Sequence, residues 1–406
     1  MSDMIALERR YAARNYDPVP IVLAQGRGAW LTDTAGNRYL DMLSAYSAVS
    51  FGHSHPRLVE ALCRQAQRLA VTSRVFHNDR LPVFLARLCE LTGMDRALPM
   101  NTGAEAVETA IKVARKWAHV TGRVPDGRAQ IIVCEGNFHG RTSTIVGFST
   151  VPQYRTGFGP FGGGFRVVPF GDPRALEAAI GPDTAAFLVE PVQGEAGVRV
   201  PPPGYLAECA AICRRRGVLL IADEVQTGLG RTGRLLACDH EGVRPDALVL
   251  GKALGGGLVP VSAFLAREDV LGVLQPGDHG STFGGNPLGA AVGLEALELL
   301  VEEGLPRRAA ELGDYLAGRL RAIDSPALRE VRGLGLLVGL EIEASVATGA
   351  QFAAALRERG ILTRETQGQV VRLAPALVIG REELDWALPR IEQALAAISP
   401  CEGARS

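Results

Sequence analysis

Lysine is scarce in this chain of 406 residues, whose 43 basic side chains are arginines except at positions 112, 116 and 252. Neither sign of charge is in excess, since 44 acidic side chains leave a net charge of -1. This balance gives no indication of a nucleic-acid partner or of a solvating acidic tail. Because so few lysines are present, each one is a candidate for a specific role.

Long apolar runs are also missing, since no stretch approaches the roughly 18 residues that a membrane span needs. We therefore expect no membrane partner. The first sixteen residues mix acidic and basic side chains without an apolar core, which predicts neither a secretory signal nor a transit peptide. The seven cysteines are odd in number and lack CxxC spacing. They indicate reduced thiols and a cytoplasmic protein.

What the sequence does contain is an ordinary globular composition, with 47% hydrophobic and 21% charged residues. Short runs rich in Val, Ile and Leu alternate with helical stretches through the middle of the chain. Continuous apolar strands of this kind suit a sheet that is buried on both faces. The alternation predicts an α/β fold with a doubly wound, mostly parallel sheet. The expected strands are 130–134, 186–189, 218–222 and 247–250, and the expected helices between them are 104–119, 173–180 and 204–216.

The two ends of the chain have a different pattern. The first fifty residues predict short strands and turns, including a hairpin with a turn at Gly36-Asn37. After a long helix that begins near Pro287, the last hundred residues mix helices and strands, as in a smaller α+β domain. We predict a large domain over 55–300 and a smaller domain formed by an N-terminal segment, 1–54, and a C-terminal part, 301–406.

Lys252 is the first candidate for chemistry, because it follows the apolar strand 247–250 and precedes three glycines. A lysine at the end of a buried strand is costly to keep charged, and a desolvated lysine becomes a nucleophile that can form a Schiff base. The alternative is an ordinary loop lysine. For Lys112 and Lys116 we favour that plainer interpretation, with Glu108 and Lys112 paired on a solvated helix face.

Asp223 stands at the end of the strand 218–222, where open α/β sheets bind ligands. It precedes Lys252 by about one helix–strand unit, so both side chains should emerge at the same edge of the sheet. A carboxylate there can pair with the protonated ring nitrogen of a cofactor. A helix cap or a salt bridge is the alternative role.

Phosphate binding needs backbone N–H groups at a helix N-terminus. Thr102, Gly103 and Ala104 open the predicted helix 104–119, and Ser281 and Thr282 form a second loop of small, hydroxyl-bearing residues. An ordinary cap or turn is the alternative for either group. The glycine-rich loop 228–233 matches GxGxxG, but no βαβ unit begins at its last glycine, so we interpret it as a loop and not as a nucleotide site.

Three further residues are candidates for ligand contacts. Phe138 follows the strand 130–134 and could stack on an aromatic ring, or could be a core residue. Arg141 and Arg372 could bind carboxylates through the bidentate guanidinium, although with so many arginines each is more often structural. His53 and His55 lack a third ligand in view, and packing or capping is favoured over a metal site. No metal is predicted.

Taken together, these residues resemble the class III aminotransferases of fold type I, which use pyridoxal 5'-phosphate. The resemblance extends from about Arg14 to Ile379. Its motifs are 44–49 (Ser-Ala-Tyr-Ser-Ala-Val), 100–103 (Met-Asn-Thr-Gly), 136–142 (Gly-Asn-Phe-His-Gly-Arg-Thr), 190–197 (Glu-Pro-Val-Gln-Gly-Glu-Ala-Gly), 221–228 (Ile-Ala-Asp-Glu-Val-Gln-Thr-Gly), 251–254 (Gly-Lys-Ala-Leu) and 280–287 (Gly-Ser-Thr-Phe-Gly-Gly-Asn-Pro). His139 stands where some members carry tryptophan.

The resemblance implies a role for each matching residue around the cofactor ring. Lys252 would hold pyridoxal phosphate as a Schiff base and shuttle a proton. Asp223 would pair with the pyridinium nitrogen, and Gln226 would face the ring hydroxyl. Phe138 would stack on one face of the ring, and Val225 would pack on the other.

It also implies an assembly. Gly103 and Ala104, with Thr282 of a partner subunit, would hold the phosphate, so the resemblance implies a homodimer whose active sites lie at the interface.

Substrate choice follows from the same resemblance. It is strongest to members that transfer the δ-amino group of L-ornithine to 2-oxoglutarate, giving glutamate semialdehyde and glutamate. Tyr16 would contact the α-amino end of ornithine, and Tyr46 would shape the pocket against shorter amines. Arg141 would hold the ornithine carboxylate, and Arg372 that of glutamate or 2-oxoglutarate. Glu195 would mask Arg372 while ornithine binds.

Two alternatives remain at this point. One is another class III activity, on acetylornithine or 4-aminobutyrate. The other is a dimeric relative without catalytic activity.

Overall fold

The computed structural model describes residues 2–399 and is dominated by one seven-stranded sheet. The strand order is β4-β10-β9-β8-β7-β5-β6. Neighbours from β9 to β6 are parallel, while β10 runs antiparallel to both β9 and β4. This mostly parallel sheet confirms the predicted α/β class. Its strands are β4 Arg96–Met100, β5 Gln130–Cys134, β6 Phe165–Val168, β7 Thr184–Val189, β8 Leu219–Asp223, β9 Ala247–Leu250 and β10 Ser262–Ala266.

The central strands are apolar throughout because both faces of the sheet are covered. Every residue of β7, β8, β9 and β10 is buried. Alternate side chains enter different cores: Leu220 and Ala222 of β8 join one cluster, and Leu219 and Ile221 join the other. Period-two alternation between two buried faces explains why these strands have no polar side.

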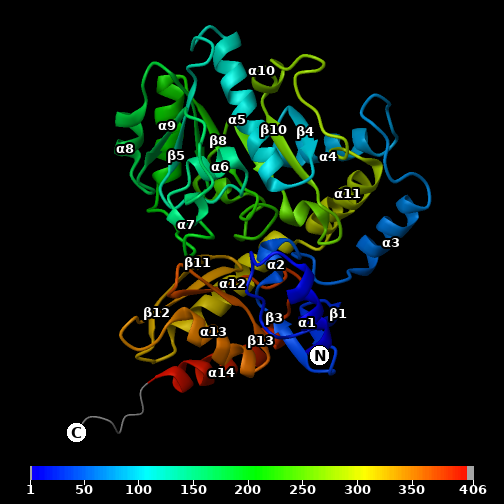
Figure 1. Cartoon of the computed structure of the whole chain (residues 1–406), viewed down its shortest axis with the longest axis vertical. Coiled ribbons are helices and arrows are strands. Elements are labelled where there is room, and N and C mark those ends of the chain that lie inside the picture. Colours follow the sequence, from blue (N-terminus) through cyan, green and yellow to red (C-terminus); the bar gives the residue numbers. More distant parts are fainter. Residues whose placement is uncertain (1, 400–406) are drawn as a thin grey trace.

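Helices cover both faces of the sheet, as Figure 1 shows. Helix α5 packs on one core, and α9 packs on the other. The helices that connect or cover this sheet are α3 Pro56–Ala66, α4 Leu81–Thr92, α5 Gly103–Val120, α6 Ser143–Gly147, α7 Pro152–Arg155, α8 Pro173–Ala179, α9 Tyr205–Arg216 and α10 Glu268–Leu271, with 3-10 turns η1 Ala237–Glu241 and η2 Lys252–Gly255.

The N-terminal and C-terminal segments lie together in the other half of the molecule (Figure 1). There β3 pairs in parallel with β13, joining an N-terminal hairpin to the C-terminal region in one sheet, β1-β2-β3-β13. A second sheet has the order β11-β12-β15-β14. The division at residues 54 and 300 stays a prediction. The strands are β1 Leu23–Arg27, β2 Trp30–Asp33, β3 Arg38–Asp41, β11 Leu328–Leu334, β12 Leu337–Ile342, β13 Ile361–Leu362, β14 Arg364–Thr366 and β15 Val370–Leu373.

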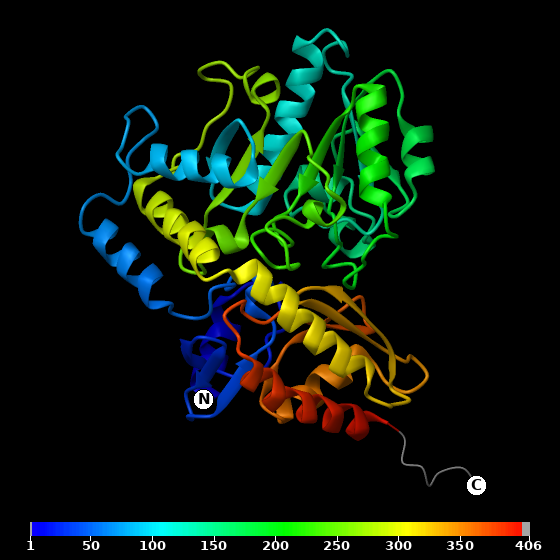
Figure 2. The same cartoon turned by 180° about the vertical axis from the view of Figure 1, so that it is seen from behind.

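Helices α11 and α12 run from the large sheet toward the terminal half, as Figure 2 shows. The short helical turn α2 lies where the two halves meet (Figure 1). The remaining helices are α1 Ser2–Tyr11, α2 Ser44–Ser47, α11 Pro287–Glu302, α12 Leu305–Arg321, α13 Gly349–Glu358 and α14 Arg381–Ile398.

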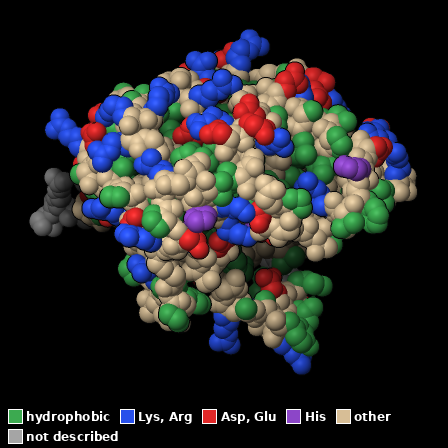
Figure 3. Space-filling model, turned by 90° about the horizontal axis from the view of Figure 1, so that it is seen from above, with side chains coloured by type: hydrophobic (Ala, Val, Ile, Leu, Met, Phe, Trp, Pro, Cys, Tyr) green, Lys and Arg blue, Asp and Glu red, His purple; other side chains and the backbone are tan. Residues whose placement is uncertain are grey.

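Three observations on the described residues bear on earlier expectations. None of their helices is long and apolar enough to cross a membrane. Their six cysteines are free thiols, and Cys401 lies outside the described part of the chain. On the face drawn in Figure 3, basic and acidic side chains are intermixed.

The predicted Glu108–Lys112 pair is wrong. The Lys112 ammonium lies 2.9 Å from Nδ1 of His279, and Glu108 instead accepts a hydrogen bond from the Thr142 hydroxyl. Helix spacing allowed the ion pair, but each partner finds a group on another element.

Candidate active site

The carboxyl ends of β5, β7, β8 and β9 reach one edge of the sheet, because these strands are parallel. A cavity of about 180 Å³ lies at this edge. The amine of Lys252 and the carboxylate of Asp223 therefore face one space, as the sequence suggested. The cavity is lined by Gly103, Ala104, Phe138, His139, Gly140, Glu190, Val192, Glu195, Asp223, Val225, Gln226, Thr227 and Lys252.

Lys252 begins the 3-10 turn η2 directly after β9. Its backbone has φ 45°, an uncommon left-handed conformation for a residue with a side chain. Burial lowers the pKa of the Lys252 ammonium to about 8, although the neighbouring Glu195 carboxylate opposes this shift. A lysine with this pKa is partly neutral near pH 7 and can act as a nucleophile.

Asp223 is fixed by two partners at the end of β8. One carboxylate oxygen lies 2.6 Å from Nδ1 of His139, and the other accepts the N–H of Val225 at 3.0 Å. His139 is fully buried. Burial disfavours the charged form of His139, but the Asp223 carboxylate outweighs burial and raises the pKa of the imidazole. The pair therefore fixes the position of the Asp223 carboxylate at the back of the cavity.

Glu190 extends this group of charges. It follows β7, and its side chain accepts the N–H of Phe138 at 2.9 Å. Burial raises the pKa of Glu190 to about 8, so it is mostly protonated near neutral pH. Its position fixes the loop that carries Phe138 and His139.

The N-terminus of α5 forms another wall. Thr102 caps the helix in a reciprocal capping box with Glu105. Gly103 and Gly140 allow close packing here, because a Cβ on Gly103 would approach Val225 to 3.0 Å and one on Gly140 would approach Ala104 to 2.8 Å. Free N–H groups at such a helix end suit an anionic group.

Phe138 and Arg141 lie together on the loop after β5. The Arg141 guanidinium is 5.4 Å from the centre of the Phe138 ring and 3.6 Å from that of Tyr154. Arg141 is exposed and has no acidic partner among the described residues. It is consequently available to an incoming carboxylate.

Arg372 lies on β15 and is buried, yet it faces the cavity through Glu195. Its Nη1 lies 2.6 Å from Oε1 of Glu195 and 3.3 Å from Oε1 of Gln226. Glu195 also accepts a hydrogen bond from Gln226 at 3.2 Å. Burial disfavours the charged form of Glu195, but Arg372 and Lys252 outweigh it and lower the pKa of this carboxyl.

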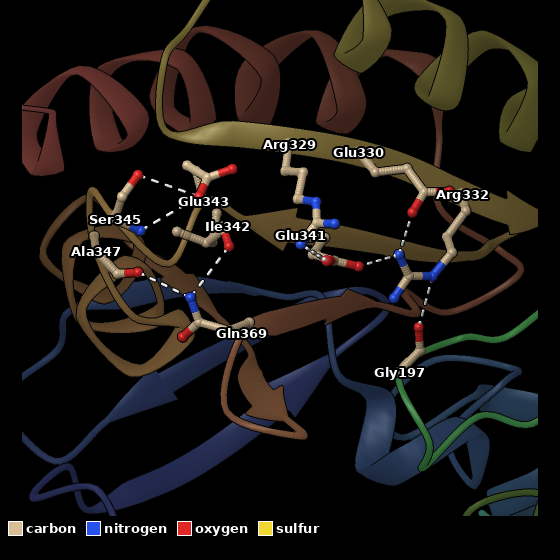
Figure 4. A network of polar contacts seen from close by, with 10 residues as sticks. All are labelled: Gly197, Arg329, Glu330, Arg332, Glu341, Ile342, Glu343, Ser345, Ala347 and Gln369. Carbon is tan, nitrogen blue, oxygen red and sulfur yellow. Dashed lines mark hydrogen bonds and ion pairs between the residues drawn. The ribbon is translucent and has the colours of Figure 1, made fainter.

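The loop that carries Glu195 is fastened to the C-terminal sheet. The Glu195 carbonyl accepts hydrogen bonds from the side chains of Thr366 and Gln367. Figure 4 shows Arg332 of β11, which donates to the carbonyl of Gly197 at 3.0 Å and also pairs with Glu330 and Glu341. The backbone of Glu195 is therefore held separately from its carboxylate.

Tyr46 reaches this region from α2. The Arg372 guanidinium lies 5.0 Å from the centre of the Tyr46 ring. Tyr46 does not line the 180 Å³ cavity itself, so its contact with the site passes through Arg372.

Three other predicted residues lie away from the cavity of this single chain. Tyr16 is 70% exposed and lines a different surface cavity beside α1. Ser281 accepts hydrogen bonds from the side chain of Asn101 and the N–H of Gly284, and Thr282 is exposed. The roles of these residues stay predictions.

The two histidines considered for a metal have other partners. His53 pairs with Asp41 at 2.8 Å, and His55 lies 3.7 Å from Glu303. Among residues 2–399, no three His, Cys, Asp or Glu side chains come together in a way that could hold a metal ion.

Sequence reasoning missed His139 and Glu190. In the sequence, His139 stands out only because some family members carry tryptophan at this position. Its pairing with Asp223, 84 positions away, has no local signal. A usable signal was position alone, because His139 and Glu190 both follow strands that end at the same edge.

The donor set fits pyridoxal phosphate. An amine of lowered pKa can bond to an aldehyde, a buried carboxylate can pair with a ring nitrogen, and capped helix N–H groups can receive a phosphate. The side chain of Gln226 passes so close to Gly194 that a Cβ there would meet it at 1.5 Å, and the amide is thereby held toward the cavity.

Comparison with known proteins agrees with this chemistry. The model of the family described as Aminotransferase class-III matches residues 11–395. An ornithine aminotransferase from Geobacillus sp. (strain WCH70) is 51% identical over 397 residues, covering 98% of this chain and 99% of that protein.

Two solved structures are similar to the whole chain. The ornithine aminotransferase of Toxoplasma gondii ME49 has a TM-score of 0.96 and 47% identity, covering 98% of this chain and 95% of that one. An acetylornithine aminotransferase from Elizabethkingia anophelis has a TM-score of 0.89 and 44% identity, covering 98% and 99%.

Proposed function

Because the chain belongs to the class III aminotransferase family, we propose that it is a pyridoxal-phosphate enzyme that transfers the δ-amino group of L-ornithine to 2-oxoglutarate. The products are glutamate 5-semialdehyde and L-glutamate. The observation that carries the proposal is one cavity lined by Lys252, Asp223 and Glu195, with Arg372 paired to Glu195. Similarity to ornithine aminotransferases over nearly the full length supports the substrate.

The residues fall into two groups by what they hold. When bound, the cofactor supplies an electron sink for the substrate carbon that loses a proton. Lys252 would hold its aldehyde carbon and move that proton, while Asp223 would pair with the ring nitrogen. Phe138 and Val225 would pack against the ring, and Gln226 would face its hydroxyl. Thr102, Gly103 and Ala104 would receive the phosphate.

The second group selects the substrate. Arg141 binds the α-carboxylate of ornithine, which directs the δ-amine toward Lys252. Glu195 neutralises Arg372 in this half of the cycle, so a second carboxylate is not required. When 2-oxoglutarate binds, Glu195 moves away and Arg372 receives the carboxylate. Specificity is then a difference of affinities set by one movable counter-charge.

We extend the proposal to a cytoplasmic homodimer. Thr282 and the neighbouring Phe283 are exposed, as are Val75 and Phe76, although the two phenylalanines and the valine are large apolar residues. A partner subunit that covers them would bring its own Ser281 and Thr282 to this phosphate site and would cover Tyr16. Free cysteine thiols suit a reducing compartment.

The test is a single-turnover spectrum of the holoenzyme with L-ornithine and no amino acceptor. We expect ornithine to convert the bound cofactor to its amine form much faster than N-acetylornithine or 4-aminobutyrate does. If one of those amines reacts faster than ornithine, the assigned substrate is wrong while the cofactor chemistry stands. If the protein binds no cofactor, the relative without catalytic activity is the correct alternative.

A further inference from the structure

The turn that presents Tyr46 is built in an unfavourable backbone conformation. Ser44, Ala45, Tyr46 and Ser47 have φ values of 46°, 45°, 59° and 74°, so four consecutive residues with side chains are left-handed. A left-handed residue with a side chain is unfavourable, and such residues normally occur singly. The surrounding structure must therefore hold this turn in place.

The N-terminal end of the turn is held by Asp41. One oxygen of this buried carboxylate accepts the N–H groups of Leu43 and Ser44 at 2.9 and 2.8 Å. The other oxygen lies 2.8 Å from Nε2 of His53. These contacts fix where the turn begins.

The C-terminal end is held by Arg231 through Ser50. Nη2 of Arg231 donates to the Ser50 hydroxyl at 3.1 Å, and that hydroxyl donates to the carbonyl of Ser47 at 3.0 Å. Nη1 of Arg231 donates to the carbonyls of Leu336 and Pro375, at 3.0 and 2.5 Å. One guanidinium thus connects the turn to two segments of the C-terminal region.

Arg231 has no acidic hydrogen-bond partner among the described residues, although it is fully buried. Burial and the charge of Arg372 lower the pKa of Arg231 to about 9, and the Asp41 carboxylate opposes this shift. Burying a charged guanidinium without an acidic partner lowers the stability of the fold. We therefore expect the hydrogen bonds that Arg231 makes to be needed.

The glycines around Arg231 explain the GxGxxG pattern without a nucleotide. Gly230 and Gly233 both have φ 93°, and a Cβ on Gly233 would approach Ala310 of α12 to 2.9 Å. A Cβ on Gly335 would meet the backbone of Thr232 at 2.4 Å. The loop is shaped to bring Arg231 between the two halves of the molecule.

We propose that Arg231 is a positioning residue for substrate discrimination, which acts through Ser50 to keep the Ser44–Ser47 turn left-handed and the Tyr46 ring against Arg372. This inference rests on the proposed function, because it assumes that Tyr46 disfavours shorter amines. The glycine-rich loop 228–233, which carries Arg231, then has a role in the choice between amine substrates.

The experiment measures kcat/KM of the holoenzyme for L-ornithine and for 4-aminobutyrate, and takes their ratio. Ser50→Ala removes the link between Arg231 and the turn, and we expect the ratio to fall about fivefold, the effect of one hydrogen bond. Arg231→Met should lower it at least as much, and Arg231→Lys should restore part of it. Thr184→Val, which removes a buried hydroxyl that accepts the N–H of Gly181, should leave the ratio unchanged.

A double-mutant cycle separates positioning from general destabilisation. In a Tyr46→Ala background, Ser50→Ala should have no further effect on the ratio, because the side chain being positioned is gone. An equal effect in both backgrounds would overturn the inference, as would an unchanged ratio in Ser50→Ala and Arg231→Met when both fold. If Tyr46→Ala itself leaves the ratio unchanged, the fault lies in the proposed role of Tyr46 and both fail together.

Discussion

Two charged pairs at the cavity have the same length and different surroundings. Asp223 and His139 are 2.6 Å apart, and so are Arg372 and Glu195. The first pair is closed to solvent on both sides, whereas the Glu195 side chain is 23% exposed. A pair that is wholly buried cannot exchange a partner without leaving a charge unpaired. A pair that is open on one side can exchange a partner. We therefore call Asp223 with His139 the fixed wall of the cavity, and Glu195 with Arg372 the displaceable wall.

The largest effect should come from Lys252, which lines the same cavity as Asp223. We expect Lys252→Ala to lower kcat by about 10⁴-fold or more, because both covalent attachment and proton transfer are lost. Lys112→Ala, which changes a surface lysine, is the matched control and should retain full activity. A Lys252→Ala enzyme with substantial turnover would contradict the assignment, and its absorption spectrum would show whether the cofactor is still bound covalently.

On the displaceable side, Glu195→Gln should separate the two half-reactions. Arg372 is then permanently available, so we expect the rate with ornithine to fall about tenfold relative to the rate with glutamate. The measurement is single-turnover kinetics with each amino donor. Glu177→Gln, which alters an exposed ion pair with Arg215 away from the cavity, serves as the control. If both half-reactions change equally, Glu195 is not a switch and the proposed contrast between the walls is wrong.

The lowered pKa of Lys252 predicts how the cofactor-free protein takes up pyridoxal phosphate. Only the neutral amine attacks the aldehyde, and with a pKa of about 8 its fraction rises about tenfold between pH 7 and pH 9. The rate at which the visible absorption band forms should follow this curve and level off above pH 9. A rate that keeps rising toward pH 10.5 would show that burial does not depress this pKa.

The smallest effect concerns the helix end that receives the phosphate. Thr102→Ala removes the cap of α5 and should lower the free energy of unfolding by about 1 kcal/mol. Thr348→Ala removes an equivalent capping box from α13, far from the cavity, and should have a similar effect on stability. Only Thr102→Ala should also weaken cofactor affinity, measured by titration of the cofactor-free protein. If the two variants bind the cofactor with equal affinity, Thr102 does not contribute to the phosphate site.

Periodicity predicted the strands that carry Lys252 and Asp223, but not the pairing of Asp223 with His139. The strands that support Lys252 and Asp223 are continuous apolar runs, and their ends can be placed from the periodicity alone. By contrast, β4 and β10 were not anticipated. Arg96 and Pro99 interrupt the apolar character of β4, which is an edge strand, and β10 pairs antiparallel inside an otherwise parallel pattern.

Local sequence patterns could not predict contacts between segments that are far apart in the chain. The pairing of Glu195 with Arg372, separated by 177 positions, came from the family resemblance and not from spacing. The left-handed turn at Tyr46 could not be anticipated, because Ser, Ala and Tyr have no preference for that conformation. It depends on Arg231, 181 positions after Ser50, whose loop had been interpreted only as a glycine-rich connection.

The separate fastening of the Glu195 backbone has a consequence for the time course of catalysis. Because Thr366 and Gln367 hold its carbonyl and Arg332 holds that of Gly197, the part that must move is one side chain. Rotamer changes of side chains take picoseconds to nanoseconds when they are exposed, whereas lids open on roughly microsecond to second timescales. If Glu195 moves as proposed, alternation between the two substrates requires a change in one side chain and no opening of the loop.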